Sequence, residues 1–138
     1  MTPEDLARIH GASFVMPAPW PARDFADFLA SPLCFVETDG AAGFILGRVI
    51  ADEAELLTIA VAPTARRQGS GARLLAAFEA TARTRGAATA FLEVAVTNEA
   101  ARGLYTGAGW QLTGRRRGYY HTPQGDPVDA EILSKQLT

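Results

Sequence analysis

A turn rich in glycine and arginine lies near the middle of this chain, between an apolar run and a long helical pattern. The apolar run ends at Pro63, and the turn that follows contains Arg66-Arg67-Gln68-Gly69-Ser70-Gly71-Ala72-Arg73. The first amides of a helix have no partner inside the helix and lie at the positive end of its dipole, so a helix that begins here could bind phosphate. Glycines at positions 69 and 71 would let a ligand approach the backbone closely, because glycine has no Cβ atom. These residues predict a phosphate-binding turn.

The residues around the two glycines exclude two common phosphate-binding motifs. A P-loop needs a lysine followed by serine or threonine after its second glycine, but Ala72 and Arg73 stand there. A dinucleotide-binding motif needs a third small residue three positions later, but that residue is Leu74. A third pattern, Arg/Gln-x-x-Gly-x-Gly/Ala, is satisfied by Arg66 and the two glycines. An exposed loop without a ligand is the alternative that the pattern alone leaves open.

The composition is that of one globular domain. The 138 residues are 48% hydrophobic and 20% charged, and Cys34 is the single cysteine. No apolar stretch approaches the roughly 20 residues of a membrane span, and residues 1–5 are acidic where a signal peptide would be basic. One cysteine allows no disulfide within the chain, and its apolar neighbours favour a buried thiol. We therefore expect a single domain over residues 1–138, located in the cytoplasm and without a membrane partner.

Charge is distributed unevenly along the chain. Residues 65–117 hold nine arginines and three glutamates, a net charge of +6, whereas the rest of the chain carries −8. A positive segment around a phosphate-binding turn suits a small polyanion such as coenzyme A, and a solvated charged surface is the alternative. Nucleic acid is a disfavoured partner, because the whole chain has a net charge of −2 and its basic residues are not interleaved with exposed aromatic ones.

Hydrophobic periodicity and turn residues indicate the elements that position this turn. We expect helices at 2–14, 21–32, 71–85 and 98–106, and strands at 33–37, 43–50, 55–61, 90–96, 110–116 and 128–133. In the third helix the inward side chains are Leu74, Leu75, Phe78 and Ala82, and the outward ones are Arg73, Glu79 and Arg83. The order α-α-β-β-β-α-β-α-β-β differs from a doubly wound nucleotide-binding fold, which begins with a strand.

A second motif follows the turn. Asn98 begins the pattern Asn-x-x-Ala-x-x-Leu-Tyr, which ends at Tyr105 and is followed by Gly109 and an aromatic residue. Together with the glycine turn, this motif resembles the acetyl-CoA site of the GCN5-related N-acetyltransferase (GNAT) superfamily. The likeness to its RimI-type ribosomal-protein-alanine N-acetyltransferases extends to Asp52-Glu53-Ala54-Glu55-Leu56, Ile59-Ala60-Val61, Leu92-Glu93-Val94 and Arg116-x-x-Tyr119-Tyr120. The resemblance runs from about Asp52 to the end and implies the α/β (α+β) GNAT fold, with a mixed central sheet and an antiparallel N-terminal meander.

The resemblance implies acetyl transfer from acetyl-CoA to an amine, and this chemistry needs a base. An α-amino group with a pKa of about 8 is mostly protonated at neutral pH. Glu93 is the only charged residue in the apolar strand 90–96, and burial would favour its use as a base. In the family the corresponding glutamate is the proposed base, acting directly or through water. The alternatives are a solvated edge-strand glutamate and a glutamate paired with an arginine.

The departing thiolate of coenzyme A needs an acid. Its thiol should resemble that of cysteine, with a pKa of about 8.5, whereas a tyrosine with a pKa of about 10 stays protonated and can donate to sulfur. The family places its acid tyrosine at Tyr105. A tyrosine that only packs on a short helix is the alternative.

The resemblance also implies the residues that bind acetyl-CoA. The backbone of Ile59, Ala60 and Val61 would pair with the pantetheine arm, and an amide near Val61 would polarise the thioester carbonyl. Asn98 would hydrogen-bond the pantetheine. The pyrophosphate would be bound by the turn, namely Arg66, Arg67, Gln68, Gly69, Ser70, Gly71 and Ala72. No metal is expected, because the two histidines, His10 and His121, have no suitably spaced partners.

Several positions depart from the family pattern. Ala95 stands where RimI-type proteins commonly carry arginine, which leaves acceptor recognition open. Gly103 and Gly107 lie in and after the short helix, where an interior glycine costs about 1 kcal/mol, so the helix that carries Tyr105 is expected to be mobile. An acidic turn contains Asp52, Glu53 and Glu55 and could attract a cationic peptide N-terminus. The alternative is a solvent-exposed turn without a role in binding.

The leading hypothesis is an acetyl-CoA-dependent N-acetyltransferase that acts on a protein N-terminal α-amine, namely the N-terminal alanine of a small-subunit ribosomal protein. A related alternative is acetylation of a small amine such as an antibiotic or a polyamine. A third possibility is a non-catalytic acyl-CoA-binding module. The presence of both Glu93 and Tyr105 favours an enzyme.

Overall fold

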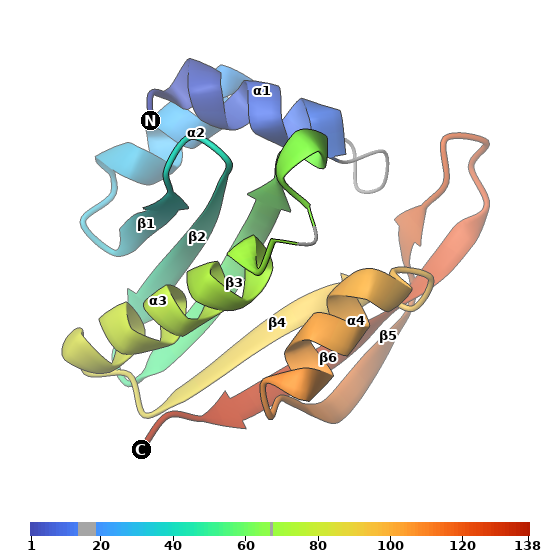
Figure 1. Cartoon of the computed structure of the whole chain (residues 1–138). Helices are drawn as coiled ribbons and strands as arrows, with labels where there is room; N and C mark the ends of the chain where they lie inside the picture. The colour runs from blue at the N-terminus through green and yellow to red at the C-terminus, as the bar shows by residue number, and fades with distance from the viewer. Residues whose placement is uncertain (14–18, 67) are drawn as a thin grey trace.

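Six strands form one mixed sheet in the computed structural model, which describes residues 1–13, 19–66 and 68–138 (Figure 1). The strands are β1 (Cys34–Asp39), β2 (Gly43–Ile50), β3 (Glu53–Val61), β4 (Thr89–Ala95), β5 (Gln111–His121) and β6 (Pro127–Gln136). Their order across the sheet is β1-β2-β3-β4-β6-β5. Neighbours are antiparallel except β3 and β4, whose parallel arrangement requires the crossover through helix α3 (Ser70–Thr84).

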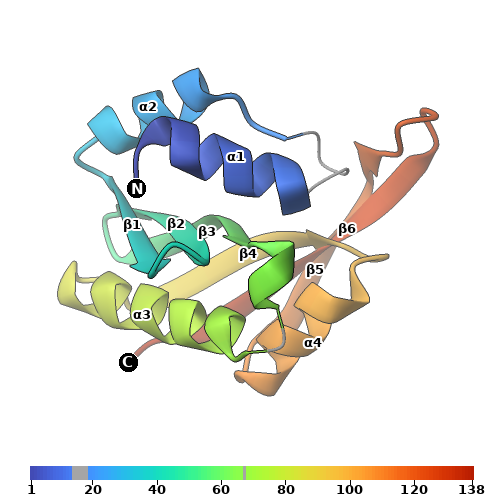
Figure 2. The same ribbon diagram turned by 45° about the horizontal axis from the view of Figure 1, so that its top comes forward.

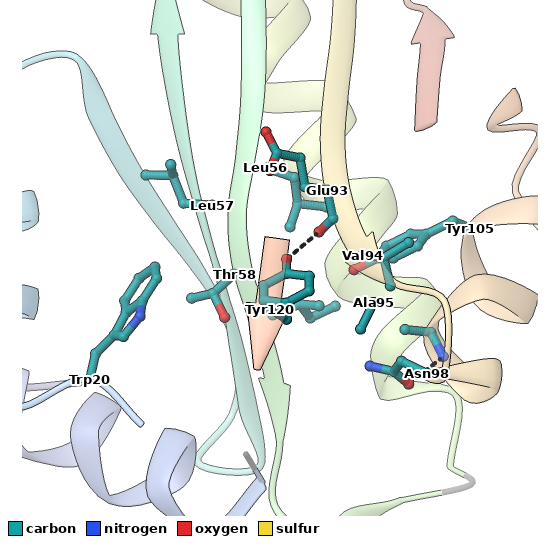
Figure 3. Close-up of a pocket in the computed structure, with 12 residues that line it drawn as sticks. Trp20, Leu56, Leu57, Thr58, Glu93, Val94, Ala95, Asn98, Tyr105 and Tyr120 are labelled. Carbon is teal, nitrogen blue, oxygen red and sulfur yellow. Dashed lines mark hydrogen bonds between the residues drawn. The ribbon is translucent and has the colours of Figure 1, made fainter. Parts of the chain in front are cut away.

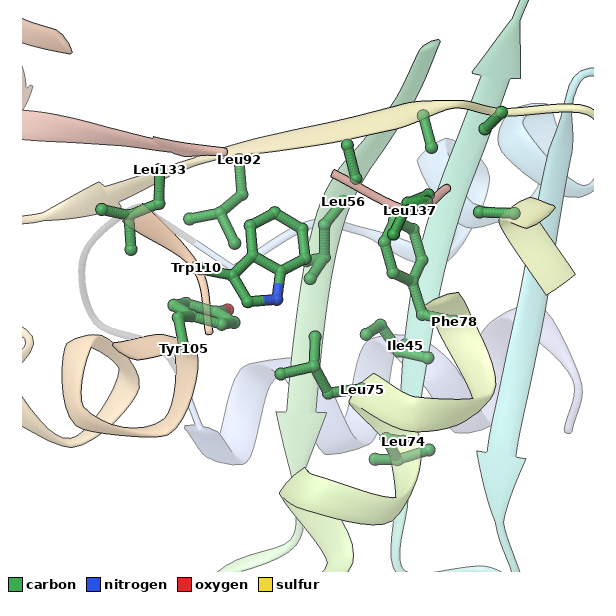
Figure 4. Packing of buried hydrophobic residues seen from close by; sticks show 14 of the residues in the cluster. Ile45, Leu56, Leu74, Leu75, Phe78, Leu92, Tyr105, Trp110, Leu133 and Leu137 are labelled. Carbon is green, nitrogen blue, oxygen red and sulfur yellow. The ribbon is translucent and has the colours of Figure 1, made fainter. Parts of the chain in front are cut away.

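Helices cover both faces of the sheet (Figure 2). Helices α1 (Pro3–Ser13) and α2 (Ala22–Ala30) lie on one face, and α3 and α4 (Glu99–Gly107) lie on the other. The apolar faces of α1 and α2 form a core with β2 and β3 that contains Leu6, Ile9, Phe25, Phe44, Leu46 and Ala60. The larger core lies beneath α3 and α4 and includes Leu56, Leu75, Phe78, Leu92, Tyr105, Trp110 and Leu133 (Figure 4).

The strands β3 and β4 pair only briefly and then diverge. Their parallel register begins at Glu53 with Thr89 and ends at Glu55 with Phe91, among the residues that the structure describes. Figure 1 shows β3 continuing toward the end of α1 while β4 turns away toward α4. The side of β3 that faces β4 therefore lacks a strand partner from Leu56 to Ala60 within the described chain, so its backbone groups can serve a ligand.

The element order agrees with the sequence prediction, and the inward side chains predicted for α3 are buried. The final hairpin is longer than expected, because β5 continues past Arg116 to His121 and β6 continues to Gln136. Strand β5 is largely exposed at the edge of the sheet, and an edge strand needs only backbone pairing with one neighbour. Residues 122–126 form the turn of this hairpin: the Thr122 amide donates to the Asp126 carbonyl oxygen at 2.9 Å.

Two side chains lie elsewhere than the sequence suggested. Glu79 was expected to face outward but is 6% exposed. Its carboxylate accepts hydrogen bonds from Trp110 Nε1 at 3.2 Å and from Lys135 Nζ at 2.7 Å, and a buried carboxylate is tolerated when it is satisfied in this way. The turn expected at Asp52 and Glu53 begins one residue earlier, with Ala51 at a positive φ of 55°, and Glu53 already belongs to β3. Phe14, expected on the first helix, lies outside the described residues.

Candidate active site

A β-bulge on β3 marks the point where the sheet opens. Leu46 of β2 pairs with Thr58, and the next residue, Gly47, pairs with Leu56, so Leu57 is the extra residue. A bulge bends its strand and redirects side chains. Accordingly, Leu56 packs in the core beneath α3, whereas Leu57 packs against the core beneath α1.

A pocket occupies this opening and is lined from five parts of the chain (Figure 3). Strand β3 contributes four consecutive residues, β4 contributes the stretch around Glu93, and α4 contributes its first turns. The segment before α2 and the hairpin strand β5 each add one aromatic residue. The lining residues are Trp20, Leu56, Leu57, Thr58, Ile59, Glu93, Val94, Ala95, Asn98, Ala101, Tyr105 and Tyr120.

Glu93 projects from β4 into this pocket, and its side chain is 15% exposed. Its Oε1 atom lies 3.3 Å from Nε of Arg116 on β5. Its Oε2 atom is buried and has no hydrogen-bond partner among the described residues. The arginine pairing that the sequence left open is therefore present, yet one carboxylate oxygen remains available to a ligand or water. Such a buried, unsatisfied oxygen is costly unless a ligand or water completes it.

Tyr105 approaches the same pocket from α4 and is 4% exposed. Burial raises the pKa of its hydroxyl well above the usual value, and the neighbouring Tyr120 raises it further. The hydroxyl is therefore protonated throughout the neutral range. The position of the ring is supported by Trp110, whose ring centroid lies 6.0 Å away and whose amide donates to the Tyr105 carbonyl oxygen at 3.0 Å.

Tyr120 was not assigned a role from the sequence, although the stretch that contains it was noted. Its hydroxyl donates to the carbonyl oxygen of Glu93 at 3.4 Å, and burial, together with the Glu93 carboxylate, raises its pKa to about 12. It reaches β4 because the β5 register shifts between Arg116 and Tyr120, where Gly118 adopts a positive φ of 58°. The amide of Gly118 donates to Asp129 Oδ1 at 2.9 Å, which holds this bulge in place.

Asn98 lines the pocket and also begins α4. Its Oδ1 atom accepts a hydrogen bond from the Ala101 amide at 3.2 Å, which is the usual N-cap interaction. The side-chain amide nitrogen is the group left to interact with a ligand. The sequence predicted a ligand contact at Asn98 and did not foresee the cap.

The glycine turn leads into the N-terminus of α3 as predicted. Gly69 adopts a left-handed conformation with φ of 77°, and as a glycine it offers α3 no capping side chain. The Ser70 hydroxyl is buried and interacts with the Asp39 carboxylate, whose pKa it helps to lower. The start of α3 fits an anion, because the first amides of a helix have no partner inside the helix. Arg67, one of the predicted phosphate ligands, lies outside the described residues.

The other residues of the turn are oriented in ways that the sequence did not indicate. Arg66 Nε donates to the Val61 carbonyl oxygen at 3.4 Å. Arg73 is not directed to a ligand, because its guanidinium donates to Asp39 at 2.9 Å and to the Gln68 carbonyl oxygen at 2.8 Å. The Arg73 guanidinium accordingly holds the pKa of the Asp39 carboxyl below its usual value. Gln68 and Ala72 are exposed beside the turn.

The second glycine of the turn has a packing role. A Cβ atom on Gly71 would lie 3.2 Å from a methyl group of Leu104 on α4. The absence of this atom lets the start of α3 and the helix that carries Tyr105 come close together. Ligand approach was the role expected for Gly71 from the sequence, whereas the contact between the two helices is the role that the structure shows.

A second, adjoining pocket lies on the outer side of Glu93. It is lined by Trp20, Phe28, Arg48, Glu55, Leu56, Leu57, Glu93, Tyr119 and Tyr120. Of the acidic turn noted in the sequence, Asp52 and Glu53 are exposed and do not line it. Glu55 does, and it forms an ion pair of 2.6 Å with Arg48. This pocket combines aromatic walls with carboxylates, a combination that suits a cationic group attached to a peptide or a small molecule.

His10 on α1 supports the pocket from behind. It is fully buried, and burial lowers its pKa to about 4. Its Nδ1 atom accepts a hydrogen bond from the Trp20 amide at 3.1 Å, so the neutral ring carries its proton on Nε2, which donates to Thr58 Oγ1 at 3.1 Å. Both partners line the pocket. His121 is exposed at the end of β5.

Among the described residues, no group of three or more histidine, cysteine, aspartate or glutamate side chains is arranged to hold a metal ion. None of the helices in this part of the chain has the length and apolarity that a membrane crossing needs. Cys34 is a free, buried thiol.

Proteins similar to this chain are acetyltransferases, in agreement with the residues of the pocket. Residues 4–110 match the model of the acetyltransferase (GNAT) family. The ribosomal protein bS18-alanine N-acetyltransferase of Salmonella typhimurium is 42% identical over 100 residues, which cover 72% of this chain and 67% of the relative. The Escherichia coli K12 protein of the same name is 39% identical over 123 residues, covering 87% and 82%. The N-alpha-acetyltransferase RimI of Mycobacterium tuberculosis is 34% identical, covering 87% and 79%.

Solved structures agree over nearly the whole chain. The crystal structure of the ribosomal-protein-alanine N-acetyltransferase from Escherichia coli superposes with a TM-score of 0.87 at 32% identity, covering 99% of this chain and 88% of that one. Ard1 from Thermoplasma volcanium gives a TM-score of 0.83 at 25% identity, covering 100% and 95%. The chain therefore belongs to the acetyltransferase (GNAT) family and is an N-acetyltransferase.

Proposed function

We propose that this enzyme acetylates the α-amine of a protein N-terminus, and that its acceptor is the N-terminal alanine of the small-subunit ribosomal protein bS18. Relatives that carry this activity in their names share 42% and 39% identity with the chain over most of its length. The observation that carries the proposal is the meeting of Glu93 and Tyr105, from different elements, in one pocket where β3 and β4 diverge.

Membership of the family implies acetyl-CoA as the acetyl donor, which supplies an activated thioester when bound. Three features of the chain fit this molecule. The side of β3 that lacks a strand partner at Ile59 and Ala60 in the described chain would hydrogen-bond the amides of the pantetheine arm as a strand does. The N-terminus of α3, from Gly69 to Ala72, would bind the pyrophosphate. The side-chain amide of Asn98 would donate to the pantetheine beside the pocket.

Glu93 is proposed to remove the proton that the acceptor amine loses. An α-amine with a pKa of about 8 reaches the pocket mostly as an ammonium group, which cannot attack a carbonyl. Oε2 of Glu93, buried and without a partner in the described chain, would accept the proton directly or through a water molecule. Tyr120 steadies the base, because its hydroxyl holds the Glu93 carbonyl oxygen.

Tyr105 is proposed to protonate the sulfur as the thiol departs. Its raised pKa keeps the hydroxyl protonated, and burial keeps bulk water from competing for the sulfur. The base reaches the pocket from β4 and the acid from α4. Different groups can therefore take the proton from the amine and give a proton to the sulfur.

The acceptor is proposed to enter through the outer pocket beside Trp20, Glu55 and Tyr119. The two pockets share Glu93 and Tyr120, so a chain end that enters the outer pocket can deliver its amine to Glu93. The partnerless Oε2 atom of Glu93 favours a cationic end, whereas Glu55 is paired with Arg48 in the same pocket. The aromatic walls are proposed to suit a small side chain such as that of alanine.

A panel of acceptors tests this assignment. Purified enzyme and acetyl-CoA are incubated with hexapeptides that begin with alanine, serine, glycine or proline, with the bS18 N-terminal peptide, and with polyamines and aminoglycosides, and the products are identified by mass spectrometry. We expect a single acetyl group on the α-amine of the alanine peptides, with the bS18 sequence turned over fastest. Faster turnover of any small amine would contradict the proposal.

A further inference from the structure

An arginine on α4 holds this helix to the sheet through three hydrogen bonds. Arg102 Nε donates to Glu131 Oε1 at 2.7 Å, and its Nη2 donates to Oε2 of the same carboxylate at 3.2 Å. Its Nη1 donates to the Val96 carbonyl oxygen at 3.2 Å, in the loop between β4 and α4. The Glu131 side chain on β6 is 12% exposed. One guanidinium therefore ties the helix, the loop and the neighbouring strand together in a bidentate geometry that lysine cannot reproduce.

Helix α4 needs such an attachment. It is nine residues long and contains Gly103 and Gly107, each of which weakens a helix relative to alanine. The sequence alone predicted a mobile helix for this reason. At the far end, Lys135 Nζ donates to the Ala108 carbonyl oxygen at 2.6 Å. Arg102 supplies the corresponding attachment near the start of the helix.

The attachment lies next to the proposed acid. Tyr105 is three residues after Arg102, so the two side chains project from adjacent turns of α4. Asn98, which begins the helix, is four residues before Arg102, and the Arg102 amide donates to its carbonyl oxygen at 3.0 Å. Any rotation or slide of α4 around the Arg102 contact would therefore displace the Tyr105 hydroxyl relative to Glu93. General acid catalysis is sensitive to displacements of this kind.

We propose that Arg102 and Glu131 are positioning residues that fix α4 so that Tyr105 reaches the departing sulfur. The inference rests on the proposed role of Tyr105 as the acid. It adds that the position of the Tyr105 hydroxyl depends on an ion pair outside the pocket. Arg102 and Glu131 are not among the residues that line the pocket.

A double-mutant cycle tests the coupling. The variants are Arg102→Lys and Glu131→Gln, called the clamp variants, then Tyr105→Phe, and each clamp variant combined with Tyr105→Phe. Turnover of acetyl-CoA with an alanine-starting peptide is measured, and thermal unfolding confirms that each variant is folded at the assay temperature. We expect each clamp variant alone to lower kcat by about ten-fold with the acetyl-CoA KM within about two-fold, and to lower it by less than about two-fold once Tyr105 is phenylalanine.

Arg83→Lys is the matched control. Arg83 joins α3 to Leu137, the residue after β6: its Nε donates to the Leu137 carbonyl oxygen at 2.7 Å. It also lies 3.6 Å from Glu79 on its own helix, so its replacement likewise removes bonds that hold a helix in place. In the double variant, the fold-decrease in kcat should equal the product of the fold-decreases caused by Arg83→Lys and by Tyr105→Phe. If the clamp variants also multiply with Tyr105→Phe, or if neither alters kcat, the positioning role is wrong. If Tyr105→Phe alone leaves turnover unchanged, the acid assignment fails instead, so the two failures are distinguishable.

Discussion

Nε of Arg116 lies 3.3 Å from Oε1 of Glu93, so a half-exposed guanidinium covers one oxygen of the carboxylate that faces the pocket. The guanidinium also lies over the Tyr119 ring, 5.2 Å from its centroid. The contact to Glu93 uses one nitrogen and is longer than a strong charge-assisted hydrogen bond. A cationic acceptor can therefore compete with Arg116 for the carboxylate.

Replacing Arg116 with glutamine removes this competitor. The pair is open to solvent on its arginine side and contributes about 1 kcal/mol, so we expect Arg116→Gln to lower the KM for the acceptor peptide by about five-fold while the KM for acetyl-CoA stays the same. Steady-state kinetics with each substrate varied in turn provides the measurement. Arg116→Lys retains the charge and should behave like the parent enzyme. A higher acceptor KM in Arg116→Gln would show that the arginine attracts the acceptor rather than competing with it.

Asn98 combines a structural and a proposed ligand role that two substitutions separate. Aspartate caps a helix as well as asparagine does, but it lacks the amide donor. Asn98→Asp should therefore keep the thermal stability of the parent and raise the acetyl-CoA dissociation constant several-fold. Asn98→Ala should raise that constant and also lower the free energy of unfolding by about 1 kcal/mol. Calorimetric titration and denaturant unfolding measure the two quantities. Unchanged acetyl-CoA affinity in Asn98→Asp would remove Asn98 from the ligand site.

Gly47 on β2 lies beneath two phenylalanine rings and does not tolerate a side chain. A Cβ atom there would lie 2.6 Å from the Phe78 ring and 2.7 Å from the Phe35 ring. Gly47→Ala should destabilise the protein by about 1–3 kcal/mol, because the packed core must shift. Gly11→Ala on α1 is the control: nothing lies within 4 Å of its Cβ position, so alanine should stabilise the helix by up to about 1 kcal/mol. Urea unfolding measures the free energy of unfolding of both variants. Equal values for Gly47→Ala and the parent would contradict the close packing at Gly47.

His10 makes stability depend on pH. Its pKa falls from the ordinary value of 6.5 to about 4 on folding, so the unfolded chain binds a proton more readily than the folded protein below pH 6.5. Its contribution is complete above pH 6.5 and is lost as the pH falls toward 4. The loss should amount to about 2–3 kcal/mol between pH 7.5 and pH 4.5. Urea unfolding at these two pH values should show a drop larger by this amount in the parent than in His10→Gln, which does not titrate. Equal drops would mean that His10 does not carry this dependence.

The element order and the inward face of α3 could be predicted from the sequence, because both depend on local periodicity. Leu74 and Phe78 recur at helical spacing. The helix begins directly after Gly69, a residue type that adopts the left-handed conformation found there. The burial of Glu79 could not be predicted in this way. It depends on Trp110 and Lys135, which are distant in the sequence and reach Glu79 only in the folded chain.

The candidate site was predictable in part for the same reason. Glu93 stands out as the single charge of an apolar strand, and Tyr105 ends a recognisable pattern. Tyr120 and Arg116 reach Glu93 only because β5 shifts its register around Gly118, and the carboxylate that holds this bulge, Asp129, comes from the opposite strand of the hairpin. A bulge of this kind leaves little trace in hydrophobic periodicity.

The central claim is that Glu93 and Tyr105 perform acetyl transfer in the pocket between β3 and β4. Its most direct test is the turnover of acetyl-CoA with an alanine-starting peptide by Glu93→Gln and Tyr105→Phe, with acetyl-CoA binding measured by calorimetry on the same samples. Both variants should bind acetyl-CoA like the parent and lose at least about ten-fold in kcat. Parent-like turnover in either variant would contradict the account for that residue, and parent-like turnover in both would contradict it altogether.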